Sequence, residues 1–414
     1  MVLIGSIVGY PLIAATTTLL DLPNTMFAIA MRVSVLASSI LLIGLALLRG
    51  ARVSAPVVLV FAAFWALYII RLTYSTTAST EPLSLAPIEY WIWAIGACFL
   101  PALAIILSGG SVNSEKLISR LVVAVFVAAV LVFLATSANS ERLDAAVIHG
   151  RLQLETLNPI SLGRVGALTL IACLWLFLTR KLTITNLALS IGFAAIGLYL
   201  LAASGARGAV VALAVPYALV LLLRLGTRRG VLFFAATCAA GYVGLLFLPL
   251  IEDYTGTNLT ERLESGINRA DAAAQSREDS FRGALEGFFQ SPITGSGLED
   301  SVTQFYPHNL LLEAFMATGA LGGILFAVLV VVALVRSVGM IARPAAPLWL
   351  PCVFVFFAIS SMFSGALYSF VEFWAMLGLM LSSFAPEFRK DRNRRAPAET
   401  SQRLAIDRMV APPD

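Results

Sequence analysis

Charged residues are scarce in this chain of 414 residues. They make up 13% of it, whereas a soluble domain carries roughly 25%. Hydrophobic residues make up 59%, and the mean hydropathy is +0.88. This balance excludes a soluble globular fold. Apolar runs of roughly 20 residues favour membrane-spanning helices over a β-barrel. The sequence therefore predicts an all-α polytopic membrane protein.

Cysteine and metal-binding patterns are also nearly missing. No Asp-x-Asp occurs, and no His, Asp and Glu cluster has clear ligand spacing, so we expect neither a metal nor a cofactor. The four cysteines lie far apart within apolar runs and are expected to be small packing residues rather than a disulfide framework. They are Cys98, Cys173, Cys238 and Cys352. The first 20 residues lack a basic region and a cleavage site of small residues, so we expect them to form a retained first span.

About twelve apolar spans are predicted along the chain, with both termini on one side of the membrane. They cover about residues 2–20, 27–48, 55–72, 88–107, 118–136, 160–179, 183–203, 208–225, 230–250, 309–335, 346–363 and 366–384. Residues 1–385 would form a transmembrane domain that includes one large polar loop at 251–308, with short helices in it. Residues 386–414 are poor in apolar side chains and are expected to form a disordered tail.

The basic residues orient these spans. If the tail is cytoplasmic, the cytoplasmic segments hold 18 of the 28 basic residues but 6 of the 24 acidic ones. Such an excess of Lys and Arg is expected on cytoplasmic loops, so the large loop is assigned to the outer side. Every basic residue on that outer side is an arginine. Guanidinium groups bind phosphate oxygens in a bidentate manner and stay charged at any working pH.

One of the two histidines ends the large loop. His308 stands between Pro307 and Asn309, where the next apolar span begins. It is either an interfacial capping residue or a general base whose tautomer is fixed by Asn309 or Glu313. Glu313 lies in an apolar run and therefore needs a partner. The other histidine, His149, is expected to be a solvated loop residue.

Two outer arginines lie at the ends of predicted spans. Arg207 occupies the short S-G-A-R-G turn at 204–208, and Arg164 lies at the outer start of another span. Either side chain could merely extend toward the interface, as arginines at helix ends commonly do. The turn around Arg207 is short and rich in Gly and Ser, so it would hold the guanidinium near the membrane surface, where a lipid-linked anion could meet it.

Residues 276–289 are predicted to form a short amphipathic helix. Ser276 followed by Asp279 resembles a capping box. At about 100° per residue, Arg277 shares one apolar stripe with Phe281 and Phe288. The alternative is an interfacial helix whose charges meet only headgroups.

The same helical phase separates two arginines of this segment. Arg282 lies away from the apolar stripe and is spaced to pair with Glu278 or Glu286. Arg277, rather than Arg282, is therefore expected beside the buried face.

These motifs resemble the O-antigen ligase and polymerase family. The resemblance lies in R-x3-F-x2-A-L-x2-F-x3-P-x2-G-x-G from Arg277 to Gly297, and in H-N-x3-E-x5-G-x2-G from His308 to Gly322. The turn at Arg207 is similar to the family's other arginine motif. The resemblance covers roughly residues 150–385, and Phe281 stands where the family usually has tryptophan.

The resemblance implies a glycosyltransferase of the GT-C type on the periplasmic face of the bacterial inner membrane. Its donor would be a glycan on undecaprenyl diphosphate, and the reaction would be inverting and metal-independent. Its partners would be membrane lipids and an acceptor, with no nucleic acid. The acceptor would be lipid A-core for a ligase, which is our first expectation, or a growing glycan for a polymerase.

The resemblance also implies roles for individual residues. His308 would activate the acceptor hydroxyl, and Asn309 and Glu313 would support it. Arg207 and Arg277, together with Arg164, would bind the donor diphosphate and stabilise its charge as it leaves.

Two other classes of function stay open. A secondary anion transporter would place essential polar residues near the bilayer midplane, within its spans. The candidate residues instead fall on one face, and Glu372 is the main charged residue inside a span. A non-catalytic scaffold is the third alternative.

Overall fold

A computed structural model shows the fold. It describes residues 1–50, 54–79, 82–109, 114–138, 147–148, 151–154, 156–179, 183–224, 272–343 and 347–382, with short pieces between 231 and 260. His149, Cys238, most of the predicted span at 230–250 and the predicted tail at 386–414 lie outside the described residues.

Nine helical segments in the described part are long and apolar enough to cross a membrane. Seven of them are single helices: α3 (Asn24–Leu48), α4 (Ala55–Thr77), α7 (Ser114–Ala138), α9 (Pro159–Thr179), α10 (Ile184–Ala203), α11 (Arg207–Arg224) and α15 (Leu310–Ile341). The segment Val2–Leu19 consists of α1 (Val2–Ile4), the π-helical η1 (Gly5–Gly9) and α2 (Tyr10–Leu19). The segment Pro87–Ser108 consists of α5 (Pro87–Trp91), the π-helical η2 (Ile92–Phe99) and α6 (Leu100–Ser108). Each of these segments coincides with a predicted span, which confirms the polytopic, helical expectation.

Shorter elements complete the described fold. The last two predicted spans contain α16 (Trp349–Ser360) and α17 (Val371–Leu381), which are apolar but shorter. The amphipathic helix α14 (Ala272–Gln290) belongs to the large loop. Strands β1 (Val147–Ile148) and β2 (Arg151–Leu152) form an antiparallel pair.

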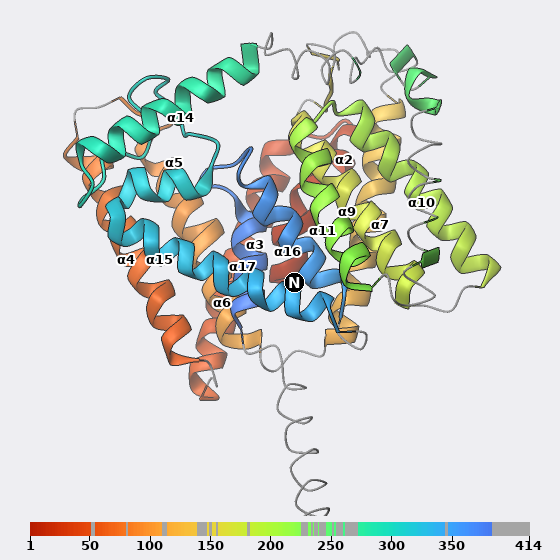
Figure 1. The fold of residues 1–414 in the computed structure, drawn as a ribbon, viewed down its shortest axis with the longest axis horizontal. Coiled ribbons are helices and arrows are strands. Elements are labelled where there is room, and N and C mark those ends of the chain that lie inside the picture. Colours follow the sequence, from red (N-terminus) through yellow and green to blue (C-terminus); the bar gives the residue numbers. More distant parts are fainter. Residues whose placement is uncertain are drawn as a thin grey trace, which may run out of the picture.

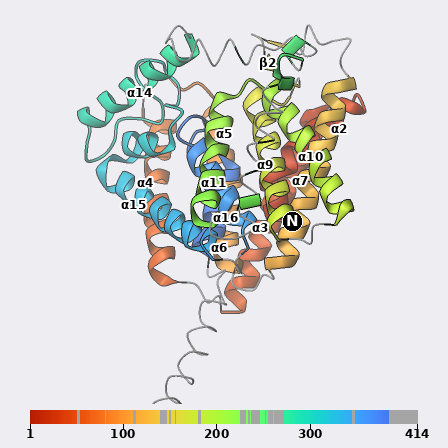
Figure 2. The same cartoon turned by 45° about the vertical axis from the view of Figure 1, so that its right-hand side comes forward.

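The two shorter apolar helices lie in the middle of the bundle, and α14 lies across one end of it (Figures 1 and 2). Almost every residue of α16 and α17 is buried. Aromatic rings fill the space between α17 and its neighbours: Trp65 of α4 packs on Trp374 with ring centroids 4.8 Å apart. Burial of such large side chains is a major source of core stability.

A turn at residues 361–370 separates α16 from α17, so the last apolar helix begins at Val371 rather than at 366 as predicted. Its backbone groups find partners on the surrounding helices. Both carboxylate oxygens of Glu313 accept the N–H of Leu367, at 3.0 and 2.9 Å, and Trp374 Nε1 donates to the Leu367 carbonyl at 2.8 Å. Irregular backbone inside a membrane protein requires such partners. Glu313 therefore has the partner that its apolar surroundings demand.

Helix α15 is broken at Gly319, whose φ of 66° and ψ of −170° are not helical. A second turn, at residues 291–297, fits into this break. Ala320 donates its N–H to the carbonyl of Pro292 at 2.7 Å, and Ser296 donates to the carbonyl of Met316 at 2.8 Å. These bonds fasten the end of α14 to the bundle.

Arg71 of α4 completes the junction between the 291–297 turn and α15. Its buried guanidinium donates to the carbonyls of Ala317 at 2.8 Å, Ser296 at 3.0 Å and Gly295 at 2.7 Å. The break in α15 frees carbonyl oxygens that would otherwise be costly to bury. Arg71, an outer arginine in the predicted topology, therefore has a structural role.

Two other arginines hold the opposite end of the bundle together. Arg224 at the end of α11 donates through Nε to the carbonyl of Ile341 at 2.8 Å. Arg336 of α15 donates to the carbonyls of Met380 and Leu381, both at 2.9 Å. Cationic donors are favourable at helix C-termini. Arg336 thus joins the last part of α15 to the end of α17. Because α15 is long, this end of the bundle lies far from His308, which immediately precedes α15.

Candidate active site

His308 lies immediately before α15 in a conformation that histidine adopts only occasionally. Its φ is +56°, in the left-handed region. The next residue, Asn309, caps α15 by accepting the N–H of Leu312 on Oδ1 at 3.0 Å. The Nδ1 atom of His308 is buried and has no hydrogen-bond partner in the described part of the chain. Strained backbone and an unsatisfied buried polar atom are both costly, and both concentrate at functional sites.

The surroundings of His308 keep it neutral. Its ring packs edge-on against Tyr306, with centroids 4.5 Å apart. Burial, followed by the Arg277 guanidinium, lowers the pKa of His308 to about 4, although Asp300 opposes the shift. At neutral pH the imidazole is therefore uncharged, the form in which it can accept a proton.

Two buried carboxylates shape the loop that leads to His308. Asp300 accepts the N–H of Thr303 on Oδ1 at 2.7 Å. Glu299 accepts the N–H of Ser84 at 2.9 Å and the hydroxyl of Tyr90 at 2.5 Å, which ties the loop to α5. These contacts fix the backbone from which His308 projects.

The expectation that Asn309 or Glu313 fixes the tautomer of His308 is wrong. Asn309 uses Oδ1 for the helix cap, and Glu313 accepts the N–H of Leu367. Neither hydrogen bonds to His308 among the described residues, and Nδ1 has no partner. Glu313 lies one helical turn inside α15, where its carboxylate contacts the 361–370 turn instead of His308.

Three arginines from separate segments line one small pocket of about 40 Å³, named here the arginine pocket. Arg207 begins α11, Arg277 lies near the start of α14, and Arg151 belongs to β2. Arg151 also donates through Nε to the carbonyl of Ser204 at 3.1 Å. No Asp or Glu is among the described residues that line it. The structure therefore brings together two of the three arginines that the sequence singled out, Arg207 and Arg277, and adds Arg151.

Helix α14 presents these arginines much as its phase predicted, with two corrections. The helix begins at Ala272, so Ser276 lies inside it and the predicted capping box is wrong. Arg282 is exposed, but its ion pair is with Asp279 at 2.5 Å rather than with Glu278 or Glu286. A spacing of three residues also places side chains side by side on a helix. Arg277 is partly buried and lines the arginine pocket.

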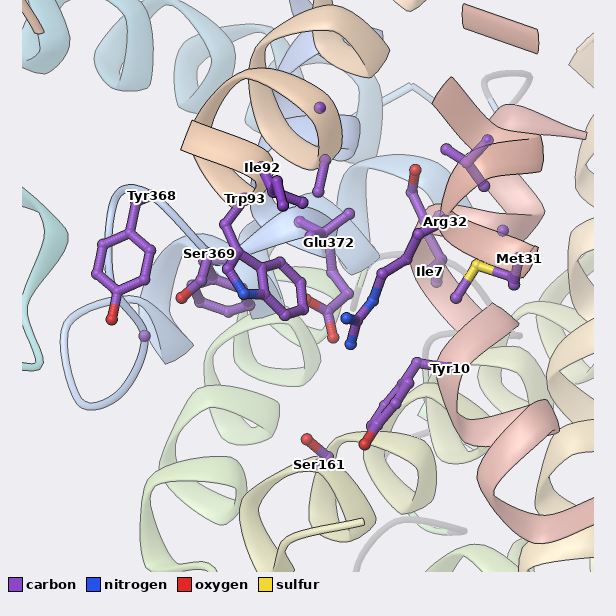
Figure 3. Close-up of a pocket in the computed structure, with 18 of the residues that line it drawn as sticks. Ile7, Tyr10, Met31, Arg32, Ile92, Trp93, Ser161, Tyr368, Ser369 and Glu372 are labelled. Atoms are coloured by element: carbon purple, nitrogen blue, oxygen red, sulfur yellow. The ribbon is translucent and has the colours of Figure 1, made fainter. Parts of the chain in front are cut away.

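Arg164 lines a different, larger cavity of about 460 Å³, named here the large cavity. Figure 3 shows this cavity, with Tyr10, Arg32 and Glu372 among the labelled residues. The Nη1 atom of Arg164 is 3.8 Å from the Glu372 carboxylate, and its Nη2 donates to the carbonyl of Ser364 at 3.3 Å. The guanidinium also stacks 3.9 Å from the ring centre of Phe370. Arg164 is not among the residues that line the arginine pocket. Ile160 and Ser364 line both spaces, so the two are neighbours.

Tyr306 connects the large cavity with His308. It lines the cavity, and its ring packs against the imidazole. Burial and then Glu313 raise the pKa of Tyr306, whereas Arg164 and Arg277 lower it. The charges of Arg164 and Arg277 therefore both act on Tyr306.

Sequence reasoning did not single out Tyr306, Arg151 or the pairing of Glu372. Weak signals for them were present: Tyr306 precedes the Pro307–His308 pair, and Arg151 is a basic residue of the outer loop before α9. Glu372 is the main charge within a predicted span, which by itself implied a buried cationic partner.

The arrangement suits binding an anion next to a proton acceptor. Guanidinium groups converging on a small space are the usual protein donors to phosphate oxygens. His308 does not line this pocket, but the charge of Arg277 contributes to the lowered pKa of its imidazole. Among the described residues, no group of three or more His, Cys, Asp or Glu side chains could hold a metal ion.

Comparison with known families gives one match. The family model described as O-antigen ligase matches residues 192–327, which include Arg207, Arg277 and His308. No curated protein and no solved structure matches the chain significantly. The chain is therefore a polytopic membrane protein that carries, over residues 192–327, the domain of the O-antigen ligase and polymerase family.

Proposed function

We propose that this protein is a membrane glycosyltransferase that transfers a glycan from undecaprenyl diphosphate to an acceptor hydroxyl. The carrying observation is the juxtaposition of a neutral, partly buried His308 with Arg277, which lines one pocket together with Arg207. A base beside a cluster of cationic donors is the combination that glycosyl transfer from a diphosphate requires. The match to the O-antigen ligase family supports the same reaction class.

In the proposed reaction His308 removes the proton from the acceptor hydroxyl. The resulting oxygen attacks C1 of the donor sugar, and the bond from C1 to the diphosphate oxygen breaks on the opposite face, which inverts the configuration. Undecaprenyl diphosphate leaves with an additional negative charge, which Arg207, Arg277 and Arg151 stabilise. The proton on His308 then passes to solvent. No step uses a metal.

We infer that the acceptor is lipid A-core, which makes the protein an O-antigen ligase, with a polymerase of O-antigen or exopolysaccharide as the alternative. A deletion strain distinguishes the two. Loss of all polymer from lipid A, with lipid-linked polymer accumulating, indicates a ligase. A single repeat unit on the core indicates a polymerase.

Transfer itself is tested with purified protein in proteoliposomes that contain a lipid-linked glycan and lipid A-core. Formation of the glycosylated product supports the proposal. A secondary anion transporter is the alternative from another class, favoured by the buried Arg164–Glu372 pair within the bundle. Anion flux in these proteoliposomes without glycan transfer would support that alternative instead.

The proposed orientation places both termini in the cytoplasm of a bacterial inner membrane and the site in the periplasm. Arg224 and Arg336, assigned to the cytoplasmic side, lie near the ends of α15 and α17, whereas His308 lies at the opposite end of α15. Reporter fusions after residues 224 and 290 test this orientation. They should be active in the cytoplasm and the periplasm, respectively.

A further inference from the structure

The large cavity is amphipathic. Apolar residues of η1, α3 and η2, among them Ile7, Leu36 and Gly96, line one part. Tyr10, Arg32, Ser161 and Glu372 line the other part, and Figure 3 shows the Arg32 guanidinium pointing between Glu372 and Tyr10. At about 460 Å³ it is the size of a typical small-molecule site, ~300–1,000 Å³.

The cavity extends to the lateral surface of the bundle. Val33 of α3 and Ile92 of η2 line it, and both are more than half exposed, at 57% and 53%. Both belong to helices long and apolar enough to cross a membrane. A mouth between such helices faces lipid rather than water.

Two arginines that line this cavity have guanidinium N–H donors with no hydrogen-bond partner among the described residues. Arg32 lies about two turns inside α3 and stacks 4.1 Å from the ring centre of Trp93, but it pairs with no carboxylate in the described part of the chain. Arg164 is 9% exposed, and its buried Nε has no hydrogen-bond partner among the described residues. Arg164 is paired with Glu372, so Arg32 is the arginine of this cavity that has no carboxylate partner among the described residues. Such a charge inside a membrane helix normally marks a functional site.

We propose that the large cavity binds the saccharide headgroup of the acceptor glycolipid, an inference that rests on the proposed transferase function. Aromatic faces, hydroxyls, guanidinium groups and a carboxylate together match the alternating apolar faces and hydroxyl edges of sugars. The Glu372 carboxylate accepts hydrogen bonds from sugar hydroxyls but repels a diphosphate. The arginine pocket, with no acidic residue among its described lining, suits the donor diphosphate instead.

The position of the cavity fits this assignment. Tyr306 lines the cavity and packs on His308, and Ile160 and Ser364 line both the cavity and the arginine pocket. A sugar in the cavity presents a hydroxyl past Tyr306 to the imidazole, with the donor diphosphate held alongside. The lipid part of the acceptor leaves through the mouth between Val33 and Ile92.

The test narrows the cavity without touching the proposed catalytic groups. A Cβ atom at Gly96 meets only the Leu36 side chain, at 3.9 Å, so Gly96→Leu should fold and fill the apolar part. Gly44→Leu on α3 is the matched control, because nothing lies within 4 Å of a Cβ there and Gly44 does not line the cavity. Arg32→Gln is the second variant, with exposed Arg282→Gln as its control.

Initial rates are measured in proteoliposomes while lipid A-core or the lipid-linked donor is varied. Gly96→Leu and Arg32→Gln should raise the KM for lipid A-core about tenfold or more, with the KM for donor nearly unchanged. An unchanged acceptor KM in both variants overturns the assignment. So does a raised donor KM, which would give the cavity to the donor lipid.

Native mass spectrometry separates this inference from the proposed function. Wild-type protein and the Gly44→Leu control should retain both lipid A-core and undecaprenyl diphosphate, whereas Gly96→Leu should retain only the diphosphate lipid. Equal retention of lipid A-core by Gly96→Leu overturns the cavity assignment even where transfer is observed. If wild-type protein transfers nothing, the proposed function fails, and the binding comparison still decides what the cavity holds.

Discussion

The environment of His308 changes the pH at which a general base should stop working. An ordinary histidine is protonated below about pH 6.5, but burial and Arg277 lower the pKa of His308 to about 4. Because only the neutral form accepts a proton, activity should persist as the pH falls through 6.5 and decline near pH 4. The acid limb of kcat/KM against pH in proteoliposomes measures this.

His308→Ala should abolish transfer while membrane insertion stays normal, because no other described side chain combines this position with a free acceptor nitrogen. His149→Ala, which removes the other histidine, is the control and should keep full activity. Wild-type rates in His308→Ala would remove the general-base role. An acid limb that stays near pH 6.5 would instead show that Arg277 and burial do not govern this imidazole.

The arginines of α11 and α14 should differ in their tolerance of lysine. Arg207→Lys and Arg277→Lys should each lower kcat/KM roughly 10- to 100-fold, since an ammonium cannot reproduce the bidentate contact of a guanidinium with a diphosphate. Arg282→Lys should be nearly neutral, because that side chain is exposed and pairs with Asp279. Equal losses at positions 277 and 282 would contradict the assignment of Arg277 to the donor.

Helical phase distinguished Arg277 from Arg282, because a period of 3.6 residues decides which side of one helix a residue occupies. The same reasoning failed for Glu313. Its partner, the N–H of Leu367, lies in a turn more than fifty residues away, and no local pattern encodes such a contact. Helical phase therefore predicted the side of the helix on which a residue lies but not its partner, as the contacts of Glu313 and Arg282 show.

At the scale of elements, the break in α15 should be essential to the fold. Gly319→Ala requires a left-handed φ of 66° from alanine, and its Cβ would overlap the carbonyl oxygen of Ile293 in the 291–297 turn. We expect it to destabilise the protein by about 2 kcal/mol or more. Thermal unfolding of the purified protein in detergent measures the change.

Gly339→Ala is the matched control on the same helix. Nothing lies within 4 Å of a Cβ at Gly339, so alanine there should be neutral or stabilising by up to about 1 kcal/mol. Similar unfolding temperatures for the two variants would mean that the break at Gly319 does not fasten the large loop to the bundle.

Elements were predictable where hydropathy alone determines them. Nine long helices coincide with predicted spans because burial in lipid forces the backbone to bond within each segment. The 361–370 turn was missed, since its composition is as apolar as that of a span. It is stable because Glu313, Trp374 and Arg164 satisfy its backbone groups, and these partners come from other helices.

At the scale of the whole molecule, the two candidate spaces draw on segments that are remote in sequence. The large cavity combines residues 5–36 with 364–372, and the arginine pocket combines Arg151, Arg207 and Arg277. Hydropathy predicted the spans that contain most of these segments but not which of them pack together. Packing of helices around α16 and α17 decides that arrangement (Figure 1).

The charge distribution of the whole site leads to the last prediction, that glycan transfer should survive EDTA. Three arginines line the pocket assigned to the diphosphate, and they supply the positive charge that a divalent cation provides in other glycosyltransferases. Two acidic residues of the loop before His308 are already engaged, because Glu299 and Asp300 accept hydrogen bonds that hold this loop. Rates measured with and without EDTA should agree within about twofold. Complete inhibition by the chelator, reversed by Mg²⁺ or Mn²⁺, would contradict this charge assignment and would make Glu299 and Asp300 the first residues to test as metal ligands.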